Sequence, residues 1–174
     1  AINEAGLAGY SFVSITGEGC PTQLGGTVTL DEGESVACTI TNDDIAPTLK
    51  LVKEVTNDNG GNAVAGNWTL TAAGDSGFSD TGDSTTFHTV KANVGYALSE
   101  SSVDGYIQGT WSCNGGSLID STVTLDLDED VTCTITNDDI APTITLTKVV
   151  VNNNGGNAQP NDFDLTIDGN VVLS

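Results

Sequence analysis

An internal repeat dominates the sequence and sets its architecture. The string CTITNDDIAPT occurs at residues 38–48 and again at residues 133–143, an offset of 95 residues. The stretch that follows, LKLVKEVTNDNGGNA at residues 49–63, returns as ITLTKVVVNNNGGNA at residues 144–158 with the same offset. A repeat of this length corresponds to one small domain, so the chain is built from copies of a single fold.

Two prolines at equivalent positions, Pro47 and Pro142, mark the predicted repeat boundaries. Residues 47–141 then form one complete domain, residues 1–46 the C-terminal part of the preceding repeat, and residues 142–174 the N-terminal part of the next. Two interpretations of the partial repeats stay open. Either the sequence is a segment of a longer continuous array, or neighbouring copies in a fibre complete each other by β-strand addition.

Apolar and polar residues alternate along several short segments, a pattern typical of β-strands. Turns rich in Gly, Asn and Asp separate these segments, and none of them has a sustained helical period. The sequence therefore predicts an all-β protein of small β-sandwich repeats, prealbumin-like or Ig-like, each about 95 residues long. We expect residues 123–127 and 131–137, joined by a turn at residues 128–130, to form the last hairpin.

Three polar residues lie on otherwise apolar strand faces and are predicted to point into the core. They are Lys53, Glu100 and Asn137. The chain has only 4 Lys and Arg residues, and the partial repeats place Lys148 and Asn42 in the same way. Because a buried charge is unstable unless it is paired or neutralised, these positions indicate a specific interaction.

The same residues resemble the prealbumin-like (Cna B-type, pilin-stalk) repeat domains of bacterial surface proteins and adhesins. The resemblance covers the complete repeat and both partial ones. It consists of a lysine near the end of the first strand, a Tyr-x-Leu-x-Glu segment followed by Gly-Tyr, and a final Ile-Thr-Asn. In this sequence these positions are Lys53, Tyr96, Leu98, Glu100, Gly105, Tyr106, Ile135, Thr136 and Asn137.

Many members of that group form a spontaneous isopeptide bond between a lysine and an asparagine, assisted by an acidic residue. The resemblance implies such a bond between Lys53 and Asn137, with Glu100 assisting. It also implies half-sites in the partial repeats, at Lys148, Glu4 and Asn42. The alternative is a buried ion pair of Lys53 and Glu100 capped by the Asn137 amide, without a covalent bond.

The four cysteines fall into two equivalent pairs, Cys20 with Cys38 and Cys113 with Cys133. Neither pair has C-x-x-C spacing and His88 is the single histidine, which argues against a zinc site. We therefore predict one disulfide in each repeat, in preference to free core thiols. Disulfides indicate an oxidising, extracellular or cell-surface location.

Acidic clusters at the repeat junctions suggest calcium as the one candidate cofactor. The string NDDIAP at residues 42–47 and 137–142 resembles the Asn-Asp-x-Ala-Pro linker of cadherins, whose junction carboxylates hold calcium. The loop at residues 57–62 is also rich in oxygen ligands suited to Ca²⁺. The alternative is ordinary turn chemistry, for which Asn, Asp and Gly are favoured. The candidate ligands are Asp43, Asp44, Asp58, Asp138 and Asp139.

Composition narrows the function classes further. The chain has 24 acidic residues and a formal net charge of −20, which disfavours binding to nucleic acid or to anionic membrane surfaces. Its apolar runs are too short to insert into a bilayer. His88 lies outside any Ser or Cys nucleophile signature, so the sequence does not predict an enzyme.

We expect a structural stalk or filament segment that contacts neighbouring repeats or copies of itself. The alternative is an adhesin-type module that binds a glycan or protein ligand, with Trp68 and Trp111 as a candidate sugar-binding surface.

Overall fold

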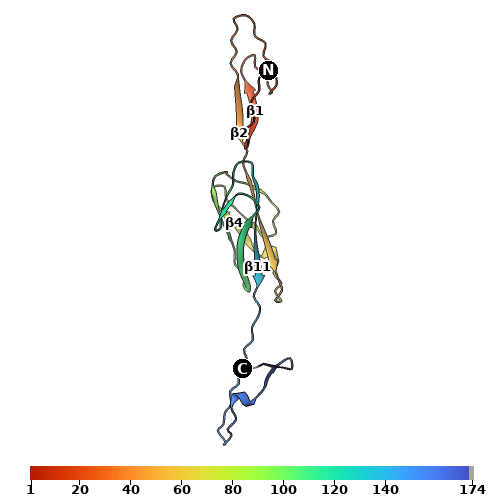
Figure 1. The fold of residues 1–174 in the computed structure, drawn as a ribbon, viewed down its shortest axis with the longest axis vertical. Helices are drawn as coiled ribbons and strands as arrows, with labels where there is room; N and C mark the ends of the chain where they lie inside the picture. Colours follow the sequence, from red (N-terminus) through yellow and green to blue (C-terminus); the bar gives the residue numbers. More distant parts are fainter. Residues whose placement is uncertain (173–174) are drawn as a thin grey trace. The chain divides into compact units, whose positions relative to one another are not determined.

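The computed structural model of the protein describes residues 1–172 and divides the chain into two compact units, Ala1–Ile140 and Ala141–Ser174. Strands make up most of the regular structure (Figure 1), alongside two short 3-10 turns, η1 (Ala65–Asn67) and η2 (Pro160–Asp162). This confirms the all-β prediction. Within the described residues, no helix is both long enough and apolar enough to cross a membrane.

Two sheets form a β-sandwich in the first unit. One sheet has the strand order β5-β4-β7-β10-β9, and the other has the order β6-β3-β11-β8. The strands are β3 (Thr48–Thr56), β4 (Thr69–Ala73), β5 (Phe78–Thr81), β6 (His88–Thr89), β7 (Gly95–Glu100), β8 (Tyr106–Cys113), β9 (Ser117–Ile119), β10 (Thr122–Thr124) and β11 (Asp130–Asp139).

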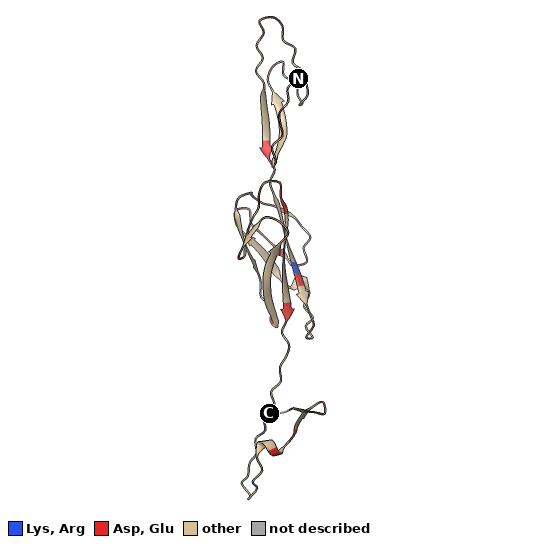
Figure 2. Ribbon diagram, in the orientation of Figure 1, with Lys and Arg blue, Asp and Glu red and all other residues tan. Residues whose placement is uncertain are grey.

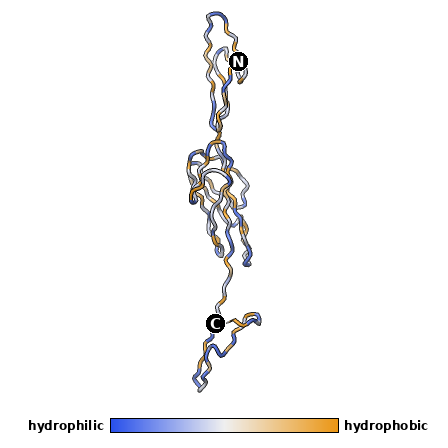
Figure 3. Tube along the Cα trace, in the orientation of Figure 1, coloured by the Kyte–Doolittle hydropathy of each residue, from blue (hydrophilic) through white to orange (hydrophobic). Residues whose placement is uncertain are grey.

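Alternating strand positions supply the core between the two sheets, as predicted. Every second residue of β11 is buried, and so are Leu49, Leu51 and Lys53 of β3, because successive side chains of a strand point to opposite faces. The alternation of apolar and polar residues is visible along the tube in Figure 3. The largest fully buried side chains are those of Trp68 and Tyr96.

The predicted last hairpin is wrong. Strand β10 pairs with β7 and β9, whereas β11 lies in the other sheet, parallel to β3 and antiparallel to β8. The segment between β10 and β11 therefore crosses from one sheet to the other. The sequence pattern could not reveal this, because strands in facing sheets and strands of one hairpin both alternate inward and outward residues.

Residues 1–46 repeat one part of the sandwich. Strand β1 (Tyr10–Thr16) pairs with β2 (Thr39–Asp44) in the arrangement of β8 and β11. Tyr10 lies opposite Asp44, as Tyr106 lies opposite Asp139, and each pair of strands contains a register shift at the equivalent place. The repeated sequence thus forms the same strand pairing in residues 1–46 as in the sandwich.

The second unit repeats local features of residues 57–70. It contains η2, β12 (Leu165–Ile167) and β13 (Asn170–Val172). The side-chain amide of Asn152 donates to the Ala158 carbonyl over 2.9 Å, as that of Asn57 donates to the Ala63 carbonyl over 3.0 Å. The same loop conformation therefore forms in both copies of the sequence.

Candidate functional site

Lys53, Glu100 and Asn137 meet inside the sandwich. Lys53 lies on β3 and Asn137 on the neighbouring parallel strand β11, while Glu100 ends β7 in the facing sheet. Lys53 and Asn137 are only 4% and 3% exposed, respectively. The three residues singled out from the sequence thus converge from three strands in two sheets.

The carboxylate of Glu100 lies between the two nitrogen atoms. The Lys53 Nζ atom is 2.6 Å from Glu100 Oε2, and the Asn137 Nδ2 atom donates to Glu100 Oε1 over 2.7 Å. One carboxylate oxygen therefore faces the amine and the other faces the amide nitrogen. This contact compensates the buried positive charge and also links the two sheets.

Two further groups lie next to the triad of Lys53, Glu100 and Asn137. The Trp68 ring centroid lies 4.7 Å from Lys53 Nζ and covers it. The Gly109 backbone N–H donates to Asn137 Oδ1 over 3.4 Å. Sequence reasoning did not identify either contact. Nothing in the sequence marks Gly109, because its position depends on the register shift between Ile135 and Asn137 in the pairing of β11 with β8.

Burial changes the acid–base behaviour of Lys53. Removal of the amine from water lowers the pKa of Lys53 below its ordinary value, and this outweighs the opposing effect of the Glu100 carboxylate. A lowered pKa increases the fraction of neutral amine, which is the nucleophilic form of lysine.

The residues predicted as half-sites make separate contacts in the two units, and their role in a bond stays a prediction. In the first unit, Asn42 Nδ2 donates to Glu4 Oε2 over 3.0 Å, which reproduces the contact of Asn137 with Glu100. In the second unit, Lys148 Nζ lies 4.1 Å from the Phe163 ring centroid, as Lys53 lies over Trp68.

All four cysteines form disulfides, in the pairs Cys20–Cys38 and Cys113–Cys133. The second disulfide joins β8 to β11, where Cys133 is fully buried in the core. The strand that carries Asn137 is therefore fixed covalently to its antiparallel neighbour.

Three other residues considered from the sequence have structural roles. Trp68 and Trp111 are only 1% and 7% exposed, so neither side chain is available as a sugar-binding surface. His88 Nε2 lies 2.7 Å from Asp80 Oδ2, and its ring stacks on Phe78.

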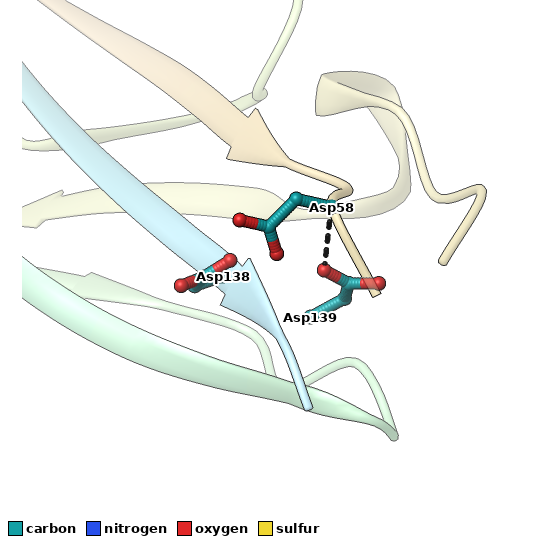
Figure 4. A group of neighbouring side chains, drawn as sticks. All are labelled: Asp58, Asp138 and Asp139. Atoms are coloured by element: carbon teal, nitrogen blue, oxygen red, sulfur yellow. Dashed lines mark hydrogen bonds between the residues drawn. The ribbon is translucent and has the colours of Figure 1, made fainter. Parts of the chain in front are cut away.

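Three of the five predicted calcium ligands cluster at the end of β11. Asp58, Asp138 and Asp139 lie close enough together to surround one ion (Figure 4). Both oxygens of Asp139 already accept backbone hydrogen bonds, from Asp58, Asn59 and Gly61. Asp139 therefore organises the 57–63 loop, and Asp58 and Asp138 carry the more accessible oxygens.

Asp43 and Asp44 lie at the acidic end of β2, as Asp138 and Asp139 lie at the end of β11 (Figure 2). Both Asp43 and Asp44 are exposed. Calcium binding at either strand end stays a prediction.

The loop can approach Asp139 closely because position 61 is a glycine. A Cβ atom there would collide with the Tyr106 hydroxyl and with Asp139. The Tyr106 hydroxyl also accepts a hydrogen bond from the Ala63 N–H over 2.9 Å and donates to Asn57 Oδ1. The Gly-Tyr motif noted in the sequence thus anchors this loop to β8.

Replacing Asp139 by asparagine is expected to reduce the acid sensitivity of the first unit. Burial alone would raise the pKa of Asp139, but hydrogen bonds from Gly61, Asn59 and Asp58 together outweigh it and lower this pKa. Such a carboxylate stabilises the fold above the unfolded-state pKa of about 3.9, and this stabilisation is lost as the pH falls through the folded-state pKa.

Urea unfolding at a series of pH values from neutral to acidic measures this effect. Asp139→Asn should be less stable than the wild type at neutral pH and should lose less stability on acidification. The exposed neighbour variant, Asp138→Asn, is the control and should follow the wild-type profile. Identical profiles for all three proteins would show that Asp139 makes no such contribution.

Comparison with known proteins found one matching family and similar solved structures. The family described as prealbumin-like fold domain matches residues 44–135 and 139–174. The major pilin T-13 from Streptococcus pyogenes serotype GAS131465 is similar at 15% identity and a TM-score of 0.43, over 58% of this chain and 48% of the pilin.

The major pilin T3.2 from Streptococcus pyogenes serotype GAS13637 is similar at 13% identity and a TM-score of 0.44, over 79% of this chain and 65% of the pilin. The chain thus spans about half to two thirds of the length of these two pilins. A comparison with curated proteins gave no match.

Proposed function

Because the chain belongs to the family of prealbumin-like fold domains, we propose that it is a structural segment of an extracellular stalk or filament, reinforced by disulfides and by a Lys53–Asn137 isopeptide bond. One observation carries this proposal. A single buried carboxylate contacts both the amine of Lys53 and the amide of Asn137, on adjacent strands.

The position of these strands in the fold gives the bond a mechanical role. Strand β3 is the first strand of the sandwich and β11 is the last, and the two pair in parallel from Thr48 to Thr56. Force applied to the chain on either side of the sandwich acts first on these two strands. A covalent link between them would carry the force directly, without loading the rest of the fold.

The local chemistry supports spontaneous bond formation. The neutral Lys53 amine attacks Cγ of Asn137, the new Nζ–Cγ bond forms, and the Cγ–Nδ2 bond breaks with release of ammonia. Glu100 accepts a proton from Nζ through Oε2 and returns one to the leaving nitrogen through Oε1. The Gly109 N–H is directed at the oxygen on which negative charge develops.

The disulfides and the net charge support an extracellular location. Two disulfides persist in an oxidising compartment, outside the reducing cytosol. A net charge of −20 keeps neighbouring molecules soluble and apart from anionic surfaces.

Intact mass spectrometry of the full chain tests the proposal. After reduction and denaturation, the wild-type chain should weigh less than its sequence by one ammonia. Lys53→Met should restore the full sequence mass. Lys50→Met, which changes a lysine on the opposite face of the same strand, is the matched control and should still lose ammonia. A wild-type chain with the full sequence mass would leave Lys53 and Glu100 as an unlinked ion pair.

A further inference from the structure

An asparagine followed by a glycine lies in the middle of the 57–63 loop. Asn59 and Gly60 are both exposed, and Gly60 has a positive φ of 96°. In such a dipeptide the glycine nitrogen can attack the side-chain amide of the asparagine, because no Cβ atom hinders its approach. Asparagine is also one of the thermolabile residues of proteins. The dipeptide therefore has the chemistry of a site of spontaneous covalent modification.

Hydrogen bonds hold the backbone on both sides of this dipeptide. The N–H groups of Asn59 and Gly61 both donate to the Asp139 carboxylate, the latter over 2.6 Å. The Gly60 N–H between them makes no hydrogen bond within the described residues. The attacking nitrogen is thus free of a partner, whereas the backbone around it is held in place by Asp139.

The side-chain amide of Asn59 is held as well. Its Nδ2 atom donates to Asp58 Oδ1 over 2.6 Å and to the backbone carbonyl of Asp139 over 3.1 Å. Attack by the neighbouring nitrogen expels Nδ2, so both contacts are lost in the reaction. Negative charge also develops on the attacking nitrogen and on the amide oxygen, and the carboxylates of Asp58 and Asp139 disfavour that charge.

We propose that Asn59 is a site of spontaneous deamidation, and that the contact between the loop and Asp139 controls the rate. The Gly60 nitrogen forms a bond to Cγ of Asn59, the Cγ–Nδ2 bond breaks, and ammonia leaves with the proton of the Gly60 N–H. One water molecule then opens the resulting succinimide ring and leaves aspartate or isoaspartate at position 59. The reaction needs no reactant other than this water.

Deamidation changes the loop irreversibly. A carboxylate at position 59 cannot donate to Asp58 or to the Asp139 carbonyl, and it adds a negative charge beside the acidic cluster at the end of β11. Isoaspartate also adds one carbon atom to the backbone, which alters the spacing of the N–H groups that meet at Asp139. The modified loop should therefore dissociate from the end of β11 as the protein ages.

Timed incubation of the full chain at neutral pH, followed by peptide mass spectrometry and isoaspartate detection, measures the reaction. Asp139→Asn replaces one accepting oxygen by an amide NH2 group. It should accelerate deamidation at Asn59 by at least about tenfold, because a hydrogen bond to a charged group contributes about that factor to holding the loop closed. Asp138→Asn is the matched control, since Asp138 contributes charge to the cluster but is exposed. Equal rates in these two variants would overturn the proposal.

Tyr106→Phe loosens the same loop without changing any charge. It removes the hydroxyl that donates to Asn57 Oδ1 and accepts from the Ala63 N–H, and it keeps the ring that packs against Trp68. Deamidation at Asn59 should accelerate several-fold in this variant. A rate equal to that of the wild type in both Tyr106→Phe and Asp139→Asn, or no deamidation at Asn59 in any of the proteins, would contradict the proposal.

Asn114 and Gly115 form a second such dipeptide in the same unit and provide an internal control. The Asn114 N–H donates to the Thr132 carbonyl, and Asn114 Oδ1 accepts from the Thr132 N–H over 2.7 Å. These contacts do not involve the 57–63 loop, so the rate at Asn114 should be the same in every variant. A parallel rise at Asn59 and Asn114 would indicate general unfolding and overturn the role of the loop contact.

Water enriched in heavy oxygen separates this inference from the proposed function. Deamidation at Asn59 takes up one labelled oxygen, whereas a bond between Lys53 and Asn137 releases ammonia and takes up none. Label at Asn59 therefore supports the inference whether or not Lys53 is linked. Ammonia loss at Asn137 without label at Asn59 in the loosened variants supports the proposed function and overturns the inference.

Discussion

Replacing Glu100 by alanine is expected to destabilise the sandwich by about 3–5 kcal/mol, the range for removing one partner of a buried charge pair. The variant leaves the Lys53 amine in the core without a counter-charge and the Asn137 amide nitrogen without its acceptor. It should also abolish ammonia loss, because the route for the proton through the carboxylate is gone.

Urea unfolding followed by tryptophan fluorescence measures this loss, since Trp68 and Trp111 both lie in the sandwich core. Glu54→Ala is the matched control. Glu54 is an exposed glutamate on β3 that accepts a hydrogen bond from Thr136, and its loss should cost about 1 kcal/mol or less. Equal losses in the two variants would show that the buried position of Glu100 has no special role.

The double variant Cys113→Ala/Cys133→Ala is expected to lose about 2–5 kcal/mol of sandwich stability. The disulfide closes a loop with a sequence separation of 20 and fixes β8 to β11 inside the core. Its removal restores conformational freedom to the unfolded chain and takes away a buried contact of Cys133.

Cys20→Ala/Cys38→Ala is the internal comparison for this experiment. Its disulfide has a similar separation, 18, but joins residues outside the two sheets of the sandwich. With tryptophan fluorescence as the readout, it should change sandwich unfolding by much less. A larger effect from this pair than from Cys113 and Cys133 would contradict the assignment of the second disulfide to the core.

The strand faces and the triad could be predicted because side-chain direction in a strand depends only on sequence parity. A lysine and an asparagine on apolar faces had to point inward, and the Lys53, Glu100 and Asn137 side chains do meet. Strand partners could not be predicted in this way. The alternation of inward and outward residues is the same in a hairpin and in two strands of facing sheets. The predicted hairpin that joins β10 to β11 is therefore wrong.

The backbone hydrogen bonds of the site also could not be predicted from the sequence. Every residue except proline has a backbone N–H, so residue type does not show which ones act as donors. Here Gly109 donates to Asn137, and three loop residues donate to Asp139. Only the fold determines which of them converge. The sequence identified Asp139 as one acid among several, whereas its contacts make it the residue that organises the 57–63 loop.

The direction of β3 and β11 has a consequence for the path of the chain through the sandwich. Because these strands run parallel, the chain enters the sandwich at the start of β3 and leaves it at the opposite end, beside Asp139. At about 3.3 Å per residue, the 10 residues of β11 advance the chain by roughly 33 Å. An antiparallel pair would return the chain to its starting side. The chain therefore enters and leaves the sandwich at opposite ends, and the segments on its two sides need not reverse direction to continue.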